Sequence, residues 1–282
     1  MQVVRDYPIQ GVGLGLRRDF FDEVSQTKNL AFDFMEIAPE NWLHLGGRYG
    51  KNLRSLTERI PFVCHGLSLD LGGIKPLDID YLKDLKQFFS QHDIRVYTEH
   101  LSYCGDSGHL YDLMPIPFTE EAVFYVADRI RQVQDVLERK IGIENVSFYA
   151  MPTTQMSEQD FVNAVLSEAE CDLLFDVNNT YVNSINHQYN AQDYMQSMPT
   201  ERIVYMHMAG HFDEADDLKI DTHGQPVKQQ VWDLLEQTYQ THGLIPTLLE
   251  RDFNIPPMEE LLQEVEQIKA YQQAWKVNNV TE

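Results

Sequence analysis

The chain is poor in cysteine and has no long apolar run. Its three cysteines, Cys64, Cys104 and Cys171, are widely spaced, which excludes a disulfide framework or a zinc ribbon and fits a reducing cytoplasm. No apolar stretch approaches the ~18 residues of a membrane span. The opening residues, MQVVRDYPIQ, lack the apolar core of a signal peptide. We therefore expect a cytoplasmic protein with no membrane partner.

Basic residues are also scarce. The sequence has 22 Lys and Arg against 44 Asp and Glu, a formal net charge of -22, and shows no Lys/Arg cluster. A surface of this sign repels nucleic-acid phosphates, so a nucleic-acid partner is not expected. Linkers, repeats and low-complexity segments are missing as well. We therefore expect one domain over residues 1–282.

Short apolar runs alternate with helical patterns along the whole chain. Runs that are apolar on both faces occur at 11–16, 32–38, 61–69, 95–102, 140–146, 172–178, 202–210 and 244–250. Helices are predicted to begin after Asp78, Thr119 and Ser157, which are candidate N-caps. Two further helices are expected at 228–242 and 257–277. The connections 103–118 and 178–200 are expected to be loop insertions. Eight strand-helix alternations predict an α/β fold, a (β/α)8 TIM barrel.

Acids and histidines stand where the strands of such a barrel would end, which is where TIM barrels gather their functional side chains. The candidates are Glu36, His65, His100, Glu144, Asp176, His207, His211, Asp221, His223 and Glu250. Side chains two apart on an extended backbone point the same way, so Asp221 and His223 can both face the mouth. Several buried acids near one point require cations. Mixed imidazole and carboxylate ligands suit iron, manganese or zinc, and so many of them predict two or three bridged ions.

Simpler interpretations compete with this prediction. A lone histidine on a strand is more often a hydrogen-bonded core residue, so the joint placement carries the metal prediction. The glycines of GVGLGL (11–16) lie inside the strand and not in a turn after it, which argues against a dinucleotide site. Gly11, Gly13 and Gly15 share one face, and we expect them to leave that wall of the barrel open for a substrate.

Motifs along nearly the whole chain, from about residue 9 to 257, resemble one bacterial family. They are MEIAPENW (35–42), HGLSLDLGG (65–73), TEHLSY (98–103), IENVS (143–147), FDVNNTYVN (175–183), HMAGH (207–211), DTHGQPV (221–227) and LLERDFNIP (248–256). Together these motifs resemble the multinuclear non-haem iron-dependent oxidases, a family that includes the methanobactin biosynthesis oxidase.

The resemblance implies a xylose-isomerase-like barrel with two or three irons of mixed valence and dioxygen as co-substrate. The substrate would be a cysteine of a ribosomally made precursor peptide, and a small partner protein would capture the peptide leader. The implied metal ligands are His65, His100, Glu144, Asp176, His187, His207, Asp221, His223 and Glu250. Glu144 and Glu250 are candidate bridges. Asn179 and His211 are the candidate catalytic residues, although Asn179 could instead help complete a third site and His211 could be a ligand.

Three alternatives remain open at this stage. A divalent-metal sugar isomerase or epimerase needs a Lys or Glu poised at the mouth for proton or hydride movement, and Lys75 and Lys219 are the nearest candidates. A zinc phosphodiesterase is disfavoured by the acidic charge and by Asn179, which stands where related zinc barrels have the His of Asp-x-x-His. A metal-storage protein would use the same ligands but would need no open coordination position.

Overall fold

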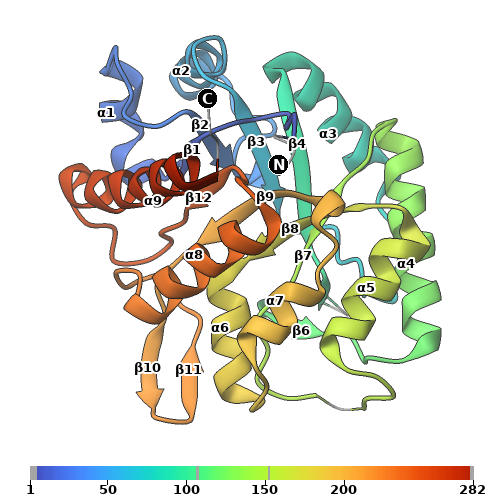
Figure 1. The fold of residues 1–282 in the computed structure, drawn as a ribbon. Helices are drawn as coiled ribbons and strands as arrows, with labels where there is room; N and C mark the ends of the chain where they lie inside the picture. Colours follow the sequence, from blue (N-terminus) through green and yellow to red (C-terminus); the bar gives the residue numbers. More distant parts are fainter. Residues whose placement is uncertain (1–4, 106–107, 152, 280–282) are drawn as a thin grey trace.

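The fold is a closed barrel of eight parallel strands surrounded by helices, as the sequence predicts (Figure 1). The computed structural model describes residues 5–105, 108–151 and 153–279. The barrel strands are β1 (Val12–Gly15), β2 (Phe34–Ile37), β3 (Phe62–Gly66), β4 (Ile94–His100), β7 (Gly142–Glu144), β8 (Asp172–Asp176), β9 (Ile203–Met208) and β12 (Thr247–Leu249). Their order around the barrel is β1-β12-β9-β8-β7-β4-β3-β2, so strands from the two ends of the chain pair and close it.

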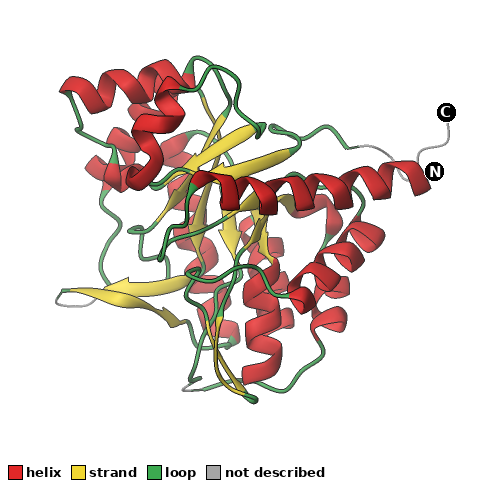
Figure 2. Cartoon of the chain, turned by 90° about the vertical axis from the view of Figure 1, so that its left-hand side faces the viewer, coloured by secondary structure: helices red, strands yellow, loops and turns green. Residues whose placement is uncertain are grey.

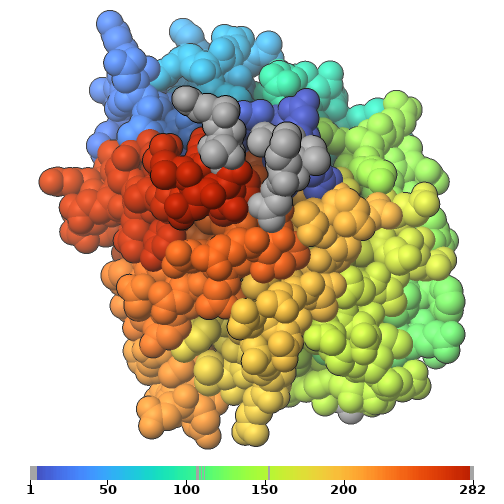
Figure 3. Space-filling view, in the orientation of Figure 1, coloured from blue at the N-terminus to red at the C-terminus, as the bar shows by residue number. Residues whose placement is uncertain are grey.

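Helices pack around the outside of the barrel (Figures 1 and 2). They are α1 (Phe21–Gln26), α2 (Gly47–Thr57), α3 (Ile79–His92), α4 (Glu120–Leu137), α5 (Glu158–Ala169), α6 (Val177–Asn186), α7 (Ala191–Ser197), α8 (Gln229–His242) and α9 (Met258–Asn279), with short 3-10 turns η1 (Arg18–Phe20), η2 (Pro39–Asn41) and η3 (Thr200–Arg202). Figure 3 shows α8 and α9, in orange and red, covering one face. None of the described helices combines the length and apolar character needed to cross a bilayer.

Three of the helices begin at the predicted caps. The Asp78 carboxylate accepts hydrogen bonds from the backbone N–H groups of Asp80 and Tyr81 at the start of α3. Thr119 and Ser157 cap α4 and α5 in the same way. Each cap satisfies N–H groups that have no partner within the helix, which fixes where the helix begins.

The two connections predicted as loops contain regular structure. The first forms an antiparallel hairpin of β5 (Ser102–Gly105) and β6 (His109–Pro115), and the second forms α6 and α7. The buried face of α6 is polar, with Asn178, Asn179 and Asn183, so no apolar helical period reveals it in the sequence. Another hairpin, β10 (Phe212–Ala215) with β11 (Leu218–Ile220), follows β9 and projects at the lower left of Figure 1.

The barrel interior is built in layers because alternate residues of each strand point inward. The lower layer is apolar and consists of Ile9, Phe34, Val63, Val96, Leu174, Val204, Tyr205 and Leu248. The expectation that Gly11, Gly13 and Gly15 leave an open wall is wrong. A Cβ on Gly13 would lie 2.4 Å from the Phe34 ring, and one on Gly15 would lie 2.9 Å from Nη1 of Arg17. The glycines make room for these two side chains, which fill the space.

Candidate metal centre

A second layer of inward-pointing residues lies toward the mouth of the barrel, and it is polar. It consists of Glu36 on β2, His65 on β3, Thr98 and His100 on β4, Glu144 on β7, Asp176 on β8, His207 on β9 and Glu250 directly after β12. We call this set the polar layer. Its residues are buried, apart from His100, which is partly exposed. Most stand two positions after an apolar residue of the lower layer, so the pleat of the strands places them at similar height.

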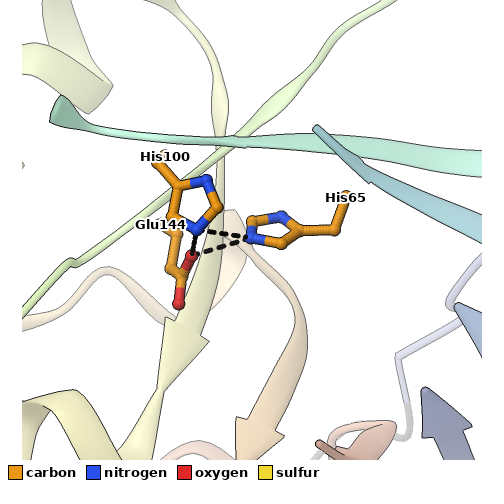
Figure 4. A group of neighbouring side chains, drawn as sticks. All are labelled: His65, His100 and Glu144. Atoms are coloured by element: carbon orange, nitrogen blue, oxygen red, sulfur yellow. Dashed lines mark hydrogen bonds and ion pairs between the residues drawn. The ribbon is translucent and has the colours of Figure 1, made fainter. Parts of the chain in front are cut away.

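His65, His100 and Glu144 converge on one point (Figure 4). Oε2 of Glu144 lies 2.9 Å from Nε2 of His65 and 3.3 Å from Nε2 of His100. The two Nε2 atoms are 3.1 Å apart. Two imidazole nitrogens and a carboxylate oxygen that face each other in this way offer three lone pairs to one position, which is the arrangement of a metal site.

A second group forms around Nδ1 of His207. This nitrogen lies 3.1 Å from Oε2 of Glu250, 3.8 Å from Oδ2 of Asp176 and 3.9 Å from Oε1 of Glu144. The ligand atoms of Glu144, Asp176 and His207 all lie within 4.8 Å of one another. Glu144 therefore belongs to two groups and presents a different oxygen to each, which is what a bridging carboxylate does.

The loop after β11 adds the third group. His223 approaches Oε2 of Glu250 with Nδ1 at 3.2 Å, and the ligand atoms of His223, Asp176 and Glu250 lie within 4.8 Å of one another. Nε2 of His223 lies 2.8 Å from Oδ1 of Asp221. The predicted pair of Asp221 and His223 thus meets the barrel residues. Ser147 donates a hydrogen bond to Oδ2 of Asp221 at 2.9 Å, which holds that carboxylate at the rim.

Several buried polar atoms of this cluster lack a hydrogen-bond partner among the described residues. They are Oε2 of Glu144, Oδ2 of Asp176, Oδ1 of Asn179, Nδ1 of His207 and Nε2 of His223. Some of them lie close to an ionisable group without forming a hydrogen bond to it, as Oε2 of Glu144 does beside Nε2 of His65. Buried polar atoms are normally satisfied. Their concentration at one place, on atoms that are all metal-ligand types, fits bound cations.

The charge of the cluster leads to the same conclusion. Seven carboxylates lie in or beside the polar layer (Glu36, Glu99, Glu144, Asp176, Asp221, Glu250 and Asp252), with one guanidinium, that of Arg17, so neutral imidazoles would leave six negative charges. One divalent ion would leave four of the six uncompensated. Because buried uncompensated charge is costly, the cluster fits more than one cation.

Without cations, protons must take their place. Burial and the neighbouring Glu144 raise the pKa of Asp176 well above its usual range. Burial opposes the charged form of His100, but the neighbouring carboxylates of Glu144, Glu99 and Glu250 together outweigh it and raise the pKa of that imidazole to about 9. Burial likewise opposes ionisation of Glu144, yet His100 and His65 lower the pKa of that carboxyl to about 2. The pKa of His207 is held well above its usual range, since Glu36 and Glu250 outweigh the effect of burial.

Four residues from the sequence prediction lie outside the ligand groups: Asp221, which pairs with His223, and His187, His211 and Asn179. His187 forms a hydrogen bond through Nε2 with the carbonyl oxygen of Phe148 at 2.8 Å and stacks on the Phe148 ring, so it is not brought to the cluster. His211 is buried, with Nδ1 2.8 Å from Oδ1 of Asn178. Nδ2 of Asn179 donates to Oε1 of Glu144 at 3.2 Å. His211 and Asn179 thus support the cluster, and we drop His187 from the ligand set.

The sequence prediction missed Arg17, and it placed Glu36 at a strand end without including it among the metal ligands. Oε2 of Glu36 lies 3.0 Å from Nε2 of His207, and Glu36 groups with His207 and Glu250. Nη2 of Arg17 lies 3.1 Å from Oε1 of Glu250 and also pairs with Asp252. The spacing could have revealed Arg17, which stands two residues after Gly15 and so points to the same side.

With this geometry established, the comparisons with known proteins identify the family. The family model described as the RiPP precursor modification enzyme MbnB/TglH/ChrH matches residues 11–273. The chain belongs to this family. The predicted resemblance is therefore confirmed. A UPF0276 protein of Alcanivorax borkumensis is 62% identical over 278 residues, covering 95% of this chain and 93% of that protein. A UPF0276 protein of Pseudomonas aeruginosa is 55% identical, covering 94% and 93% of the two chains.

Solved structures confirm that the barrel is of the xylose-isomerase type. The 3-keto-D-glucoside 4-epimerase YcjR from E. coli superposes with a TM-score of 0.63 at 11% identity, covering 92% of this chain and 98% of that one. Endonuclease IV from Thermus thermophilus gives 0.59 at 14% identity, covering 95% and 100%. At such low identities the similarity concerns the fold alone, and an epimerase and a nuclease on one barrel show that fold does not decide activity.

Proposed function

We propose that this family member is a multinuclear, iron- and dioxygen-dependent oxidase that modifies cysteine residues of a ribosomally made precursor peptide. The observation that supports it most is the set of linked ligand groups, in which Glu144, Asp176 and Glu250 each belong to more than one group. The family supplies the precursor peptide as the substrate class. Iron, dioxygen and the cysteine target are the parts that experiment must test.

The donor set fits two or three irons. His65, His100 and Glu144 would hold one ion, and Glu144, Asp176 and His207 a second, so that Glu144 belongs to both groups. His223 and Asp221 would hold a third together with Asp176 and Glu250. Imidazole and carboxylate ligands without thiolate suit iron, and bound iron would supply the one-electron chemistry for a reaction with dioxygen.

The chain's own residues orient this site. His211 bonds to Oδ1 of Asn178, whose Nδ2 donates to Oδ1 of Asp221 at 2.8 Å, so His211 positions Asp221 through that amide. Arg17 holds one oxygen of Glu250 and leaves the other facing His207 and His223. Asp221, His223 and His100 are only partly buried, so a thiol that enters from the mouth meets this side of the cluster first.

The rim around the mouth suits a peptide. Leu67, Tyr149, Phe212 and Phe253 lie on connections that leave the C-terminal ends of β3, β7, β9 and β12, and each is 41 to 65% exposed. Exposed aromatic and aliphatic side chains favour contact with a macromolecular substrate. A leader-capturing partner protein and a cytoplasmic location complete the proposal, with no nucleic-acid partner because of the net charge of -22.

The two candidate lysines give the sugar epimerase alternative no support. Lys75 is exposed on the β3–α3 connection, and Lys219 pairs with Asp213 on the hairpin, so neither lysine lies in the polar layer. A zinc hydrolase would use the same ligands, which makes the identity of the metal the deciding measurement.

The test is metal analysis combined with Mössbauer spectroscopy of protein produced with ample iron. We expect about two to three irons per chain and magnetically coupled ferric iron. Co-expression with a cysteine-bearing precursor peptide should then change the peptide's mass, in step with dioxygen consumption. Stoichiometric zinc and no iron would reject the oxidase. His100→Ala should lower the metal content, whereas His92→Ala, at a buried histidine hydrogen-bonded to Thr57, should not.

A further inference from the structure

Beneath the ligand groups, a continuous chain of hydrogen bonds joins two of the histidines across the barrel. Nδ1 of His65 lies 2.8 Å from Oγ1 of Thr98, which lies 2.9 Å from the hydroxyl of Tyr205. That hydroxyl lies 2.5 Å from Oε2 of Glu36, and Nε2 of His207 lies 3.0 Å from the same oxygen. Every member is at most 5% exposed, so water does not compete with these bonds.

The donor and acceptor of each hydrogen bond in this chain can be assigned by starting from Glu36. An ionised Glu36 can only accept, so the Tyr205 hydroxyl and Nε2–H of His207 both donate to it. With its proton committed to Glu36, Tyr205 accepts from the Thr98 hydroxyl. Thr98 in turn accepts from Nδ1–H of His65. This assignment gives every member of the chain a partner.

The consequence is a fixed tautomer at each end. His65 carries its proton on Nδ1 and presents the lone pair of Nε2, the atom 2.9 Å from Oε2 of Glu144. His207 carries its proton on Nε2 and presents the lone pair of Nδ1, the atom 3.1 Å from Oε2 of Glu250. Both lone pairs therefore face the ligand groups, although the two rings use different nitrogens.

We propose that Thr98, Tyr205 and Glu36 are positioning residues that select which nitrogen of His65 and of His207 binds metal. The inference rests on the proposed metal-dependent function and assigns roles to three residues that need not contact the metal themselves. Glu36 has a second effect, because a carboxylate that accepts from an imidazole N–H raises the basicity of the opposite nitrogen. Oε2 of Glu36 already accepts from two donors, so a direct-ligand role for Glu36 would have to use its Oε1.

The first experiment reads the tautomers directly. Zinc-loaded protein is diamagnetic, so long-range 1H–15N NMR of 15N-histidine-labelled protein reports which nitrogen of each ring carries hydrogen. We expect Nδ1–H for His65 and Nε2–H for His207, with the zinc-bound nitrogens opposite. Metal on Nε2 of His207 would overturn the proposal. This result is separable from the proposed function, since a chain that binds no metal fails that function, whereas a loaded chain with the wrong tautomers fails only this inference.

The second experiment measures metal affinity by competition between zinc and a chromophoric chelator. Glu36→Gln keeps the shape and an acceptor oxygen but removes the charge, and we expect affinity to fall roughly 10- to 100-fold. Tyr205→Phe breaks the chain in the middle and should weaken binding too. Tyr239→Phe is the matched control, because its equally buried hydroxyl bonds to Thr247 away from the cluster. A purely structural role would lower stability in all three variants and leave affinity unchanged, and that pattern would also overturn the proposal.

Discussion

Glu144 contacts more histidines than any other carboxylate among the described residues, so Glu144→Gln tests the site most sharply. In the absence of metal, His100 and His65 hold the Glu144 pKa at about 2, against the usual 4.5. A pKa difference of one between the folded and unfolded states corresponds to about 1.4 kcal/mol. At pH 7 the ionised form therefore stabilises the metal-free fold by about 3 kcal/mol, and glutamine, which has no charge, should lose most of that.

The pH dependence has a definite sign. Because the folded-state pKa is lowered, the stabilisation is complete above pH 4.5 and disappears as the pH falls toward 2. Chemical unfolding with chelator present should thus show a gap of about 3 kcal/mol between wild type and Glu144→Gln at pH 7, and a smaller gap at pH 3. With iron supplied, the variant should also lose at least one ion per chain, because Glu144 belongs to two ligand groups.

Glu158→Gln is the matched control for this experiment. Glu158 is also buried, but it lies at the start of α5 and in none of the ligand groups. Its substitution should leave metal content unchanged. If Glu144→Gln kept the full metal content and unfolded like wild type at pH 7, the reasoning that links this carboxylate to the histidines and to two cations would be refuted.

Three further predictions test other parts of the structure. Burial raises the Glu158 pKa to about 7, so the free energy of unfolding of wild type should fall by up to about 3 kcal/mol as the pH rises from 4.5 to 7. Chemical unfolding of Glu158→Gln should not show this fall. Gly15→Ala places a Cβ 2.9 Å from Nη1 of Arg17 and should lower metal occupancy by releasing Glu250, whereas Gly46→Ala, with nothing within 4 Å, should match wild type on metal analysis. Phe253→Ser should raise the KM for the peptide several-fold at constant metal content, and Val277→Ser, on α9 and similarly exposed, should not.

Much of the fold was predictable because its signals are local. The alternation of strands and helices is fixed by short runs that are apolar on both faces and by helix caps at Asp78, Thr119 and Ser157. The candidate ligands were predicted from one rule, that barrel strands deliver their functional residues at their C-terminal ends. The rule works here because His65, His100 and Glu144 are separated along the chain but equal in height in the barrel.

The remainder depends on side chains whose partners come from distant strands. Asn178 and Asn179 look like loop residues, but tertiary hydrogen bonds to Asp221 and Glu144 allow them to lie on the buried face of a helix. Tyr205 looks like a core aromatic, and only the folded barrel brings its hydroxyl to Glu36 from a strand 169 residues away. His187 lies apart from the cluster because proximity in sequence to a ligand-rich motif does not specify the direction of a side chain.

The apolar layer below the metal centre has a consequence for turnover. Phe34, Leu174 and Leu248 fill the barrel on the far side of the candidate metal centre, so reactants can reach that centre only from the mouth. Under the proposed function, the product must therefore leave through the mouth before the next peptide can enter.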